Sequence, residues 1–333
     1  MDDGMRFSVI LPVCHGGALL RRALKSLRAM DYPQDSYEVI IAARPGDEES
    51  ERLVDETCCD WPAEARFVRA SRAGRSAQLN AACSAARGQV LALTDDDCAP
   101  PPDWLRRIEQ ALAQRPGTDV LGGTDELSGT NGAFDAALDW ALNSFAGTGS
   151  ARAVGAGLGR CYPKLWNMAV RRDAAVRAAI GGAQVFDERL PVHEDVDLCV
   201  RVERQGGCIA VAPELRMPHR RETSLRSFLA RNFRMAQASR RIGAHRLAHS
   251  ALVGALVAGM GLLVGAALAP ALAPAALGAA GGYALLLLGC AVAGAVERRD
   301  LRMVALVPVL LAGLHMARAL GYLWPGPAGK ERR

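Results

Sequence analysis

With 333 residues, the chain is longer than one typical domain and has room for a catalytic domain and a further region. Half of the residues are hydrophobic, and the formal net charge of +5 at pH 7 is too modest to favour nucleic acid as a partner. The nine cysteines have no metal-site spacing, so we interpret them as reduced thiols of a cytosolic domain rather than as zinc ligands or disulfides.

Apolar runs and helical patterns alternate through the first hundred residues. Strands are expected at residues 7–13, 37–42, 66–70 and 90–94, with an amphipathic helix at 18–30 and an Ala-rich helix after the loop at 71–80. The first strand begins close to the N-terminus, so we expect no cleaved signal peptide. This alternation predicts an α/β fold with a mostly parallel sheet and helices on both faces.

Three consecutive carboxylates follow the fourth of these strands. Asp95, Asp96 and Asp97 lie between an apolar run and a proline-rich turn, at the edge where open α/β sheets bind ligands. Such crowded carboxylates repel one another unless a cation joins them, and their oxygens suit Mg²⁺ or Mn²⁺ shared with substrate phosphates. The alternative is a structural acidic turn that stabilises the N-terminus of the next helix.

A second acidic pair opens a later helix. Glu194 and Asp195 begin the helix expected at 194–204, and a last strand is expected at 209–212. A carboxylate can take the proton of an attacking hydroxyl, so the pair is a candidate general base; the alternative is that acidic residues simply favour a first helical turn. Between the two acidic centres we expect a helix at 134–145, a Gly-rich candidate lid at 147–159 and a strand-like run at 164–170.

Taken together, these motifs resemble glycosyltransferase family 2 with the GT-A fold, whose sheet is Rossmann-like. The resemblance covers roughly residues 6–242 and depends on several runs in the family's order. They are Leu-Pro-Val at 11–13, Gly-Arg-Ser-Ala-Gln-Leu-Asn at 74–80, the acidic turn at 95–97, Asn-Met-Ala-Val-Arg-Arg at 167–172, Phe-Asp-Glu-Arg-Leu at 186–190 and His-Glu-Asp at 193–195.

The resemblance implies a role for each of these runs. Asp95 and Asp97 would hold Mg²⁺ or Mn²⁺ on the diphosphate of a nucleotide-sugar, where the metal stabilises the charge of the leaving group. The substrate-binding residues implied are Pro12, Val13, Arg75, Asn80, Asp96 and Asn167. Asp195 would be the catalytic base and Glu194 an assisting residue, and a single base without a second nucleophile implies inversion at the anomeric carbon.

The nucleotide is less well defined than the reaction. Many relatives carry an Asp after the second strand that meets the base or ribose, whereas this chain has Arg44 near that place and Asp47 shifted in register. The identity of the nucleotide therefore stays open, with a UDP-sugar as the first expectation.

The C-terminal third of the chain is strongly apolar. Stretches at 250–272, 273–296 and 303–323 are each long enough to span about 30 Å of hydrocarbon. Before them, an amphipathic helix at 224–241 carries Arg231 and Arg234, which either reach the donor diphosphate, as the resemblance implies, or contact lipid only. Positive-inside counting places the arginines at 216–246 and 298–299 in the cytoplasm; for the third stretch a full crossing is preferred over an interfacial helix.

The sequence thus predicts a GT-A domain at 1–223, an interfacial helix and linker at 224–249, a membrane region at 250–324 with two to three transmembrane helices, and a basic tail at 325–333. The expected function is inverting transfer of a sugar from a nucleotide-sugar to a lipid-linked or polysaccharide acceptor at the cytoplasmic face of the cell inner membrane. The alternatives are a non-catalytic membrane scaffold that keeps the fold, and a sugar-nucleotide pyrophosphorylase, whose Gly-rich basic loop the run at 15–18 does not supply.

Overall fold

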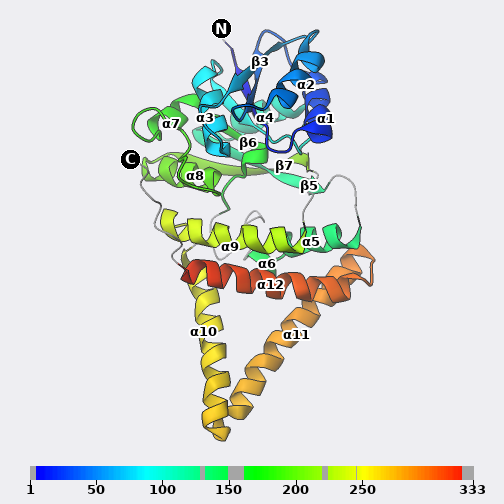
Figure 1. Ribbon diagram of the computed structural model, residues 1–333, viewed down its shortest axis with the longest axis vertical. Coiled ribbons are helices and arrows are strands. Elements are labelled where there is room, and N and C mark those ends of the chain that lie inside the picture. Colours follow the sequence, from blue (N-terminus) through cyan, green and yellow to red (C-terminus); the bar gives the residue numbers. More distant parts are fainter. Residues whose placement is uncertain (1–4, 128–131, 149–160, 220–223, 245, 325–333) are drawn as a thin grey trace. The chain divides into compact units, whose positions relative to one another are not determined.

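The computed structural model describes residues 5–127, 132–148, 161–219, 224–244 and 246–324. The chain divides into two compact units, coloured by sequence in Figure 1. The sheet unit comprises Met1–Ser128 and Tyr162–Arg221, and the helical unit comprises Gly129–Cys161 and Glu222–Arg333.

The sheet unit is built on a seven-stranded sheet with the order β3-β2-β1-β4-β6-β5-β7. The strands are β1 (Phe7–Pro12), β2 (Tyr37–Ala43), β3 (Glu64–Arg69), β4 (Val90–Leu93), β5 (Thr118–Leu127), β6 (Met168–Arg171) and β7 (Cys208–His219). Within it, β6 runs antiparallel to both of its neighbours, β4 and β5, and the remaining pairs are parallel. The expected mostly parallel α/β sheet is confirmed.

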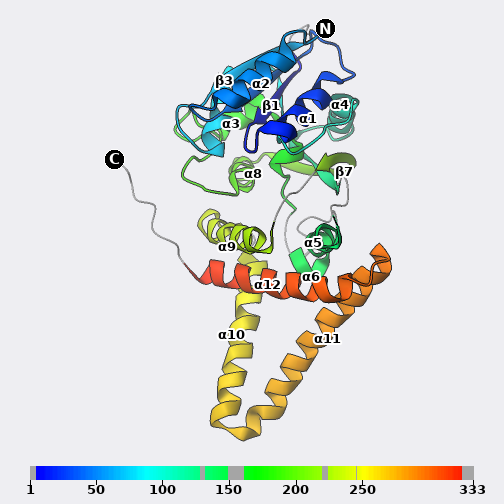
Figure 2. The ribbon, with the colours of Figure 1, turned by 45° about the vertical axis from the view of Figure 1, so that its right-hand side comes forward.

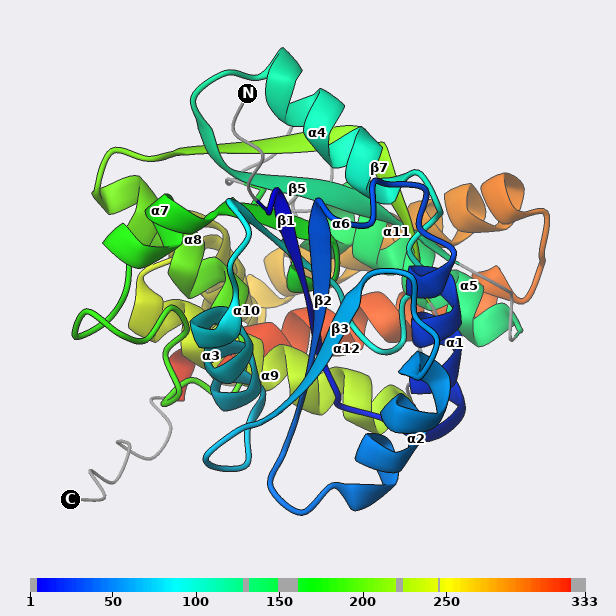
Figure 3. The ribbon, with the colours of Figure 1, turned by 90° about the horizontal axis from the view of Figure 1, so that it is seen from above.

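Helices cover both faces of this sheet (Figure 3). On one face, α1 (Gly17–Arg28), α2 (Glu48–Cys58) and α4 (Trp104–Gln114) share a core with alternate residues of β1 and β2. On the other face lie α3 (Arg75–Ala85), α7 (Arg172–Arg177) and α8 (Glu194–Arg204). Every residue of β1 and β2 is buried, as their mainly apolar runs predict for strands covered on both sides.

The strand order reverses between β1 and β4, which pair in parallel although three helices and two strands separate them in sequence. The carboxyl ends of two such strands diverge into loops on either side of a crevice, the usual ligand site of open α/β sheets. Here the two loops are 13–16 after β1 and the acidic turn at 94–97 after β4.

Two strands differ from the sequence expectation. The sequence pattern does not indicate β5, and β7 runs to His219, beyond the expected end at Ala212. Pro213 interrupts the apolar pattern there, and the β5–β7 register shifts at this point, between Gly122 and Thr124. A bulge accommodates a proline that regular pairing would exclude, so the strand continues beyond the place where its pattern stops.

The helical unit contains α5 (Ala133–Asn143), α6 (Phe145–Thr148), α9 (Leu225–Ile242), α10 (Arg246–Leu268), the short 3₁₀ turn η2 (Pro270–Leu272), α11 (Ala273–Arg298) and α12 (Met303–Leu323). Figures 1 and 2 show α10 and α11 as a hairpin that meets at this turn, with α12 running across the other ends of its arms beside α9. In the described part of the chain, three helices have the length and apolar character needed to cross a bilayer: Ser250–Leu268, Pro270–Arg298 and Met303–Leu323.

Helices α5 and α6, which the sequence analysis assigns to the first domain, pack with the C-terminal helices instead. Helix α5 is apolar on one face, and Leu138 and Leu142 are buried against residues of α9 and α12 such as Phe228 and Leu311. An apolar helical face must be covered, and within this unit α9 and α12 provide the cover. Residues 149–159 of the candidate lid and the basic tail lie outside the described residues.

Candidate active site

Asp96 holds the loop after β1. It is fully buried, and its Oδ2 accepts hydrogen bonds from the backbone N–H groups of Cys14 (3.0 Å), His15 (2.6 Å) and Gly16 (2.9 Å). His15 Nδ1 lies 2.8 Å from the other oxygen, and this hydrogen bond raises the pKa of the His15 imidazole. A carboxylate that accepts so many hydrogen bonds fixes the backbone of the loop.

The same loop is anchored from its other side by α3. The side-chain amide of Gln78 donates to the Val13 carbonyl oxygen at 2.9 Å, and both residues are buried. Gly16 has φ +68°, a conformation that suits glycine, and a Cβ there would lie 3.3 Å from Ser50 Oγ. Pro12 therefore ends β1, and Val13 begins a loop that these contacts hold in one conformation.

Asp95 faces the start of α3. Arg75, the first residue of that helix, donates from Nη2 to both carboxylate oxygens of Asp95, and its Nε lies 3.3 Å from Glu194 Oε1. Burial alone would lower the pKa of Arg75, but the charges of Asp95 and Glu194 raise it well above its ordinary value. Burial raises the pKa of both carboxyls, and the Arg75 charge opposes that rise.

Asp97 faces the end of β7. Its Oδ2 lies 3.1 Å from His219 Nε2, because a bridge between Cys98 and His219 brings the end of this strand beside the acidic turn. Burial disfavours the charge of Asp97, but the hydrogen bond and charge of His219 lower its pKa overall. Side-chain ligand atoms of Asp97, Cys98 and His219 all lie within 4.8 Å of one another.

Glu194 and Asp195 are the first two residues of α8, directly after His193. This histidine has φ 69°, a left-handed conformation that is uncommon for residues other than glycine. It turns the chain sharply into the helix. Asp195 accepts from the Val196 N–H at 2.7 Å. Its burial raises the pKa, but the charges of Lys164 and His193 and this hydrogen bond lower it overall, so the carboxylate is ionised at neutral pH.

The two acidic centres therefore meet at one side chain. Arg75 contacts Asp95 of the turn after β4 and Glu194 at the start of α8, 99 positions later in the chain. Carboxylates from these separate elements share a polar cluster at the sheet edge where the strand order reverses.

A family model described as "Glycosyltransferase like family 2" matches residues 5–238. The chain belongs to this glycosyltransferase family. Among curated relatives, glycosyltransferase AglE of Haloferax volcanii is 25% identical over 125 residues, which are 38% of this chain and 41% of the relative. The match thus spans less than half of that relative's length.

Solved structures share the fold of this glycosyltransferase-family chain. The mannosyltransferase PcManGT of Pyrobaculum calidifontis, solved in complex with GDP-Man and Mn²⁺, aligns with a TM-score of 0.64 at 19% identity, covering 96% of this chain and 88% of that one. S. aureus TarS residues 1–349, solved with UDP-GlcNAc, aligns with a TM-score of 0.51 at 17% identity, covering 96% and 89%. At these identities the likeness concerns the fold, which is GT-A-like.

Two predicted substrate-binding residues of the family 2 chain are engaged by the protein itself. Asn80 donates to the Phe186 carbonyl (2.9 Å) and to Glu188 Oε1 (2.8 Å), and accepts from the Phe186 N–H (2.9 Å). Asn167 accepts from Trp104 Nε1 at 3.0 Å and donates to the Leu215 carbonyl at 2.9 Å. Both side chains are buried, so they join elements of the sheet unit near the site.

Arg231 and Arg234 lie on α9 of the helical unit, and both are exposed. Arg234 Nε donates to the Ala230 carbonyl of its own helix at 3.3 Å. Their contact with the donor diphosphate, implied by the family resemblance, stays a prediction.

The sequence analysis missed His219 and His15. His15 follows the first strand directly, so its position was readable, but its partner Asp96 is 81 residues away. His219 stands beyond the two prolines of β7, where no apolar pattern indicated a strand, and 122 residues separate it from Asp97. A histidine after the last strand of an α/β sheet is the signal that would have pointed to it.

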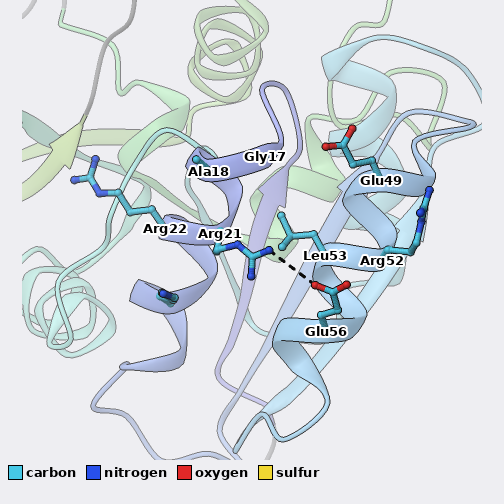
Figure 4. A pocket seen from close by; sticks show the side chains of 9 residues that line it. Gly17, Ala18, Arg21, Arg22, Glu49, Arg52, Leu53 and Glu56 are labelled. Carbon is cyan, nitrogen blue, oxygen red and sulfur yellow. Dashed lines mark ion pairs between the residues drawn. The ribbon is translucent and has the colours of Figure 1, made fainter.

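A hollow of about 680 Å³ lies between α1 and α2 (Figure 4). Its lining includes Arg21, Arg22, Lys25 and Arg52, together with Glu49 and Glu56. Arg21 lies 3.9 Å from Glu56 in an exposed ion pair. With acidic and basic side chains mixed and largely solvated, this hollow is a charged surface groove.

Proposed function

We propose that the protein is a metal-dependent, inverting glycosyltransferase that moves a sugar from a nucleotide-sugar donor to a lipid-linked or polysaccharide acceptor. The observation that carries this proposal is the cluster at the carboxyl ends of β1 and β4, where Asp95 and Asp97 lie in one turn and Glu194 pairs with the same arginine as Asp95. Family membership supports the reaction class.

The residues present fit a divalent cation. Asp97 supplies a carboxylate and His219 an imidazole in contact with it, and Asp95 supplies further oxygens in the same turn. Mg²⁺ is bound mainly through oxygen, so an imidazole in the set favours Mn²⁺. When bound, such an ion neutralises charge on a leaving diphosphate. PcManGT, of the same fold, was solved with Mn²⁺ and a nucleotide-sugar.

The chain's own residues would prepare the acceptor and hold the donor. Asp195 is ionised and lies at the start of α8. It would take the proton of the acceptor hydroxyl while the acceptor oxygen bonds to the anomeric carbon. The donor's sugar–phosphate bond breaks on the opposite side, so configuration inverts. The loop at 13–16, fixed by Asp96 and Gln78, would present its backbone to the nucleotide.

We place the site at the cytoplasmic face of the cell inner membrane. Three helices are apolar enough to span a bilayer, and α9 and the end of α11 carry many of the arginines expected on the cytoplasmic side. Anchoring would keep the enzyme beside an acceptor confined to the membrane. A UDP-sugar is the first donor to test, although the relatives of known structure include one solved with GDP-Man and one with UDP-GlcNAc.

The test is Mn²⁺-dependent hydrolysis and transfer with a panel of nucleotide-sugars, comparing wild type with Asp97→Ala and Asp195→Asn. Asp97→Ala should lose metal-dependent donor binding, and Asp195→Asn should bind donor but transfer at least about a hundredfold more slowly. Asp173→Asn, in an exposed ion pair with Arg177, is the matched control and should retain full activity.

Two results would contradict the proposal. If no nucleotide-sugar binds or is hydrolysed with Mn²⁺, a non-catalytic scaffold would be the better account. If Asp97→Ala and Asp195→Asn keep wild-type activity, the site is misplaced even if the protein is a transferase.

A further inference from the structure

Arg75 occupies a position that bears on how the proposed metal site works. Its guanidinium donates to both oxygens of Asp95, and its Nε lies 3.3 Å from Glu194 Oε1. The side chain is only 26% exposed and extends from the first residue of α3, which begins after Gly74 with φ +130°. Arg75 is thus fixed by the backbone at one end and by two carboxylates at the other.

This contact disfavours the binding of a cation at Asp95. The guanidinium uses both carboxylate oxygens, and its positive charge close to them would repel a divalent ion bound to the same oxygens. Asp97 differs, because its hydrogen-bond partner is His219, a residue able to act as a ligand itself. The two aspartates of the turn therefore differ. Asp97 can bind a metal in the conformation it already has, whereas Asp95 would first have to release Arg75.

We propose that Arg75 competes with the metal for Asp95, and that the donor's diphosphate draws Arg75 away from Asp95, so that metal and nucleotide bind cooperatively. A diphosphate offers the planar guanidinium the same paired oxygens that Asp95 offers, at higher negative charge. The site then completes its metal coordination only when a donor is present. This inference rests on the proposed function, since it assumes the metal and the nucleotide.

The prediction follows from linkage. If Arg75 opposes metal binding in the nucleotide-free protein, removing its charge should tighten metal binding there and reduce the further gain that nucleotide brings. The probe is Mn²⁺ alone, titrated into the full-length protein in detergent micelles and followed by calorimetry or by electron paramagnetic resonance of free Mn²⁺. The titration is then repeated with saturating UDP and with saturating GDP.

Arg75→Gln should bind Mn²⁺ without nucleotide about tenfold more tightly than wild type, within the usual range of coupling between sites. In wild type, the better of the two nucleotides should tighten Mn²⁺ binding by a larger factor than in Arg75→Gln. Arg75→Lys, which keeps the positive charge but carries it on a compact ammonium group, should fall between wild type and Arg75→Gln.

Three comparisons isolate the cause. Arg69→Gln removes an equal charge from an exposed ion pair with Glu51 and should change Mn²⁺ affinity by less than about twofold. In an Asp95→Asn background, Arg75→Gln should bring no gain, because the contested ligand is gone. Thermal unfolding of each variant shows whether it is folded, and Arg75→Lys provides a second test if Arg75→Gln is not.

Nucleotide-free Mn²⁺ affinity that is unchanged or weaker in both Arg75 variants would overturn the inference. That failure differs from failure of the proposed function. If wild type does not bind Mn²⁺ either with or without nucleotide, the metal assignment itself is wrong. If wild type binds Mn²⁺ with nucleotide and the Arg75 variants do so identically at every step, only the competition falls.

Discussion

At the scale of single residues, buried carboxylates have separate tasks in this sheet unit. Asp96 binds three backbone N–H groups of the loop after β1, whereas its neighbours Asp95 and Asp97 face an arginine and a histidine. Glu38, buried within β2, joins Ser8 of β1 to two arginines. Adjacent or similar side chains thus differ in function because each backbone position directs them to different partners.

Asp96→Asn tests whether this residue orders the loop or contacts substrate, as the family resemblance implied. An amide has one acceptor oxygen in place of two and no charge, so the loop at 14–16 should lose much of its support. We expect a loss of about 2–3 kcal/mol in unfolding free energy, measured by thermal or urea unfolding. A variant as stable as wild type that nevertheless loses donor binding would indicate a substrate contact instead.

Glu38 gives the sheet a pH dependence. Burial disfavours its charge, but hydrogen bonds from Ser8, from the Arg87 N–H and from Arg66 lower its pKa overall. A carboxyl whose pKa is lower in the folded state adds stability above its unfolded pKa of about 4.3, and this stability is lost as pH falls through the folded value. Glu38→Gln should therefore cost about 2 kcal/mol at pH 7 and progressively less below about pH 4.

The measurement for Glu38 is the difference in melting temperature between wild type and variant across pH 7 to pH 3.5. Glu64→Gln is the matched control, because Glu64 pairs with the same two arginines but is 45% exposed. Its effect should stay under about 0.5 kcal/mol at every pH. A Glu38→Gln penalty that is the same at pH 7 and pH 3.5 would show that the charge contributes nothing.

At the scale of elements, the helical unit pairs helices of opposite character. α12 is apolar enough to cross a bilayer, yet it packs along α9, which carries Arg226, Arg231, Arg234, Arg240 and Arg241. His315 lies 2.7 Å from the Ala146 carbonyl, and Arg318 donates to the Gly147 carbonyl at 2.8 Å, so these two polar side chains face α6 rather than lipid. A helix that carries so many charges cannot accompany its partner through hydrocarbon.

We therefore expect α12 to lie at the membrane surface, in place of the full crossing preferred from sequence. A reporter fused after Arg333 should then lie on the cytoplasmic side: green fluorescent protein should fluoresce there and alkaline phosphatase should be inactive. The same reporters inserted after Ala269, at the turn between α10 and α11, should give the opposite pattern. If alkaline phosphatase fused after Arg333 is active, α12 crosses the membrane and this expectation is wrong.

At the scale of the whole molecule, the chain does not pass once from one unit to the other. It leaves the sheet unit after Ser128, contributes α5 and α6 to the helical unit, and returns at Tyr162 before leaving again after Arg221. Arg298 pairs with Asp139, and Trp140 donates to Glu297 at 2.8 Å, so polar contacts add to the apolar packing of α5.

A truncation at residue 223, the domain boundary drawn from sequence, tests this arrangement. It removes the partners of Leu138 and Leu142 and should expose the apolar face of α5. We expect the fragment 1–223 to aggregate. In the linker variant, a short Gly-Ser linker replaces residues 129–161 of this fragment, and this variant should be monomeric in size-exclusion chromatography. A soluble, monomeric fragment 1–223 that melts like the linker variant would contradict the expectation.

Much of this architecture could be predicted because its signal is local. β1, β2 and β4 are mainly apolar runs. The acidic turn directly follows β4, and Glu194 and Asp195 are the first residues of α8. What could not be predicted depends on partners distant in sequence. The pairing of Asp97 with His219, the double contact of Arg75 and the internal engagement of Asn80 exist only after the strands have assembled.

The double passage of the chain also affects how the protein is made. Ala146 of α6, which directly follows α5, and its partner His315 of α12 are 169 residues apart, so at roughly 5–20 residues per second α5 and α6 emerge from the ribosome about ten to thirty seconds before α12 can cover them. During that interval the apolar face of α5 lacks the cover that α12 provides in the finished protein. Biogenesis of this protein would therefore depend on a chaperone or on early delivery of the ribosome to the bilayer. Depleting the chaperone or delaying that delivery should lower the yield of folded protein without altering its structure.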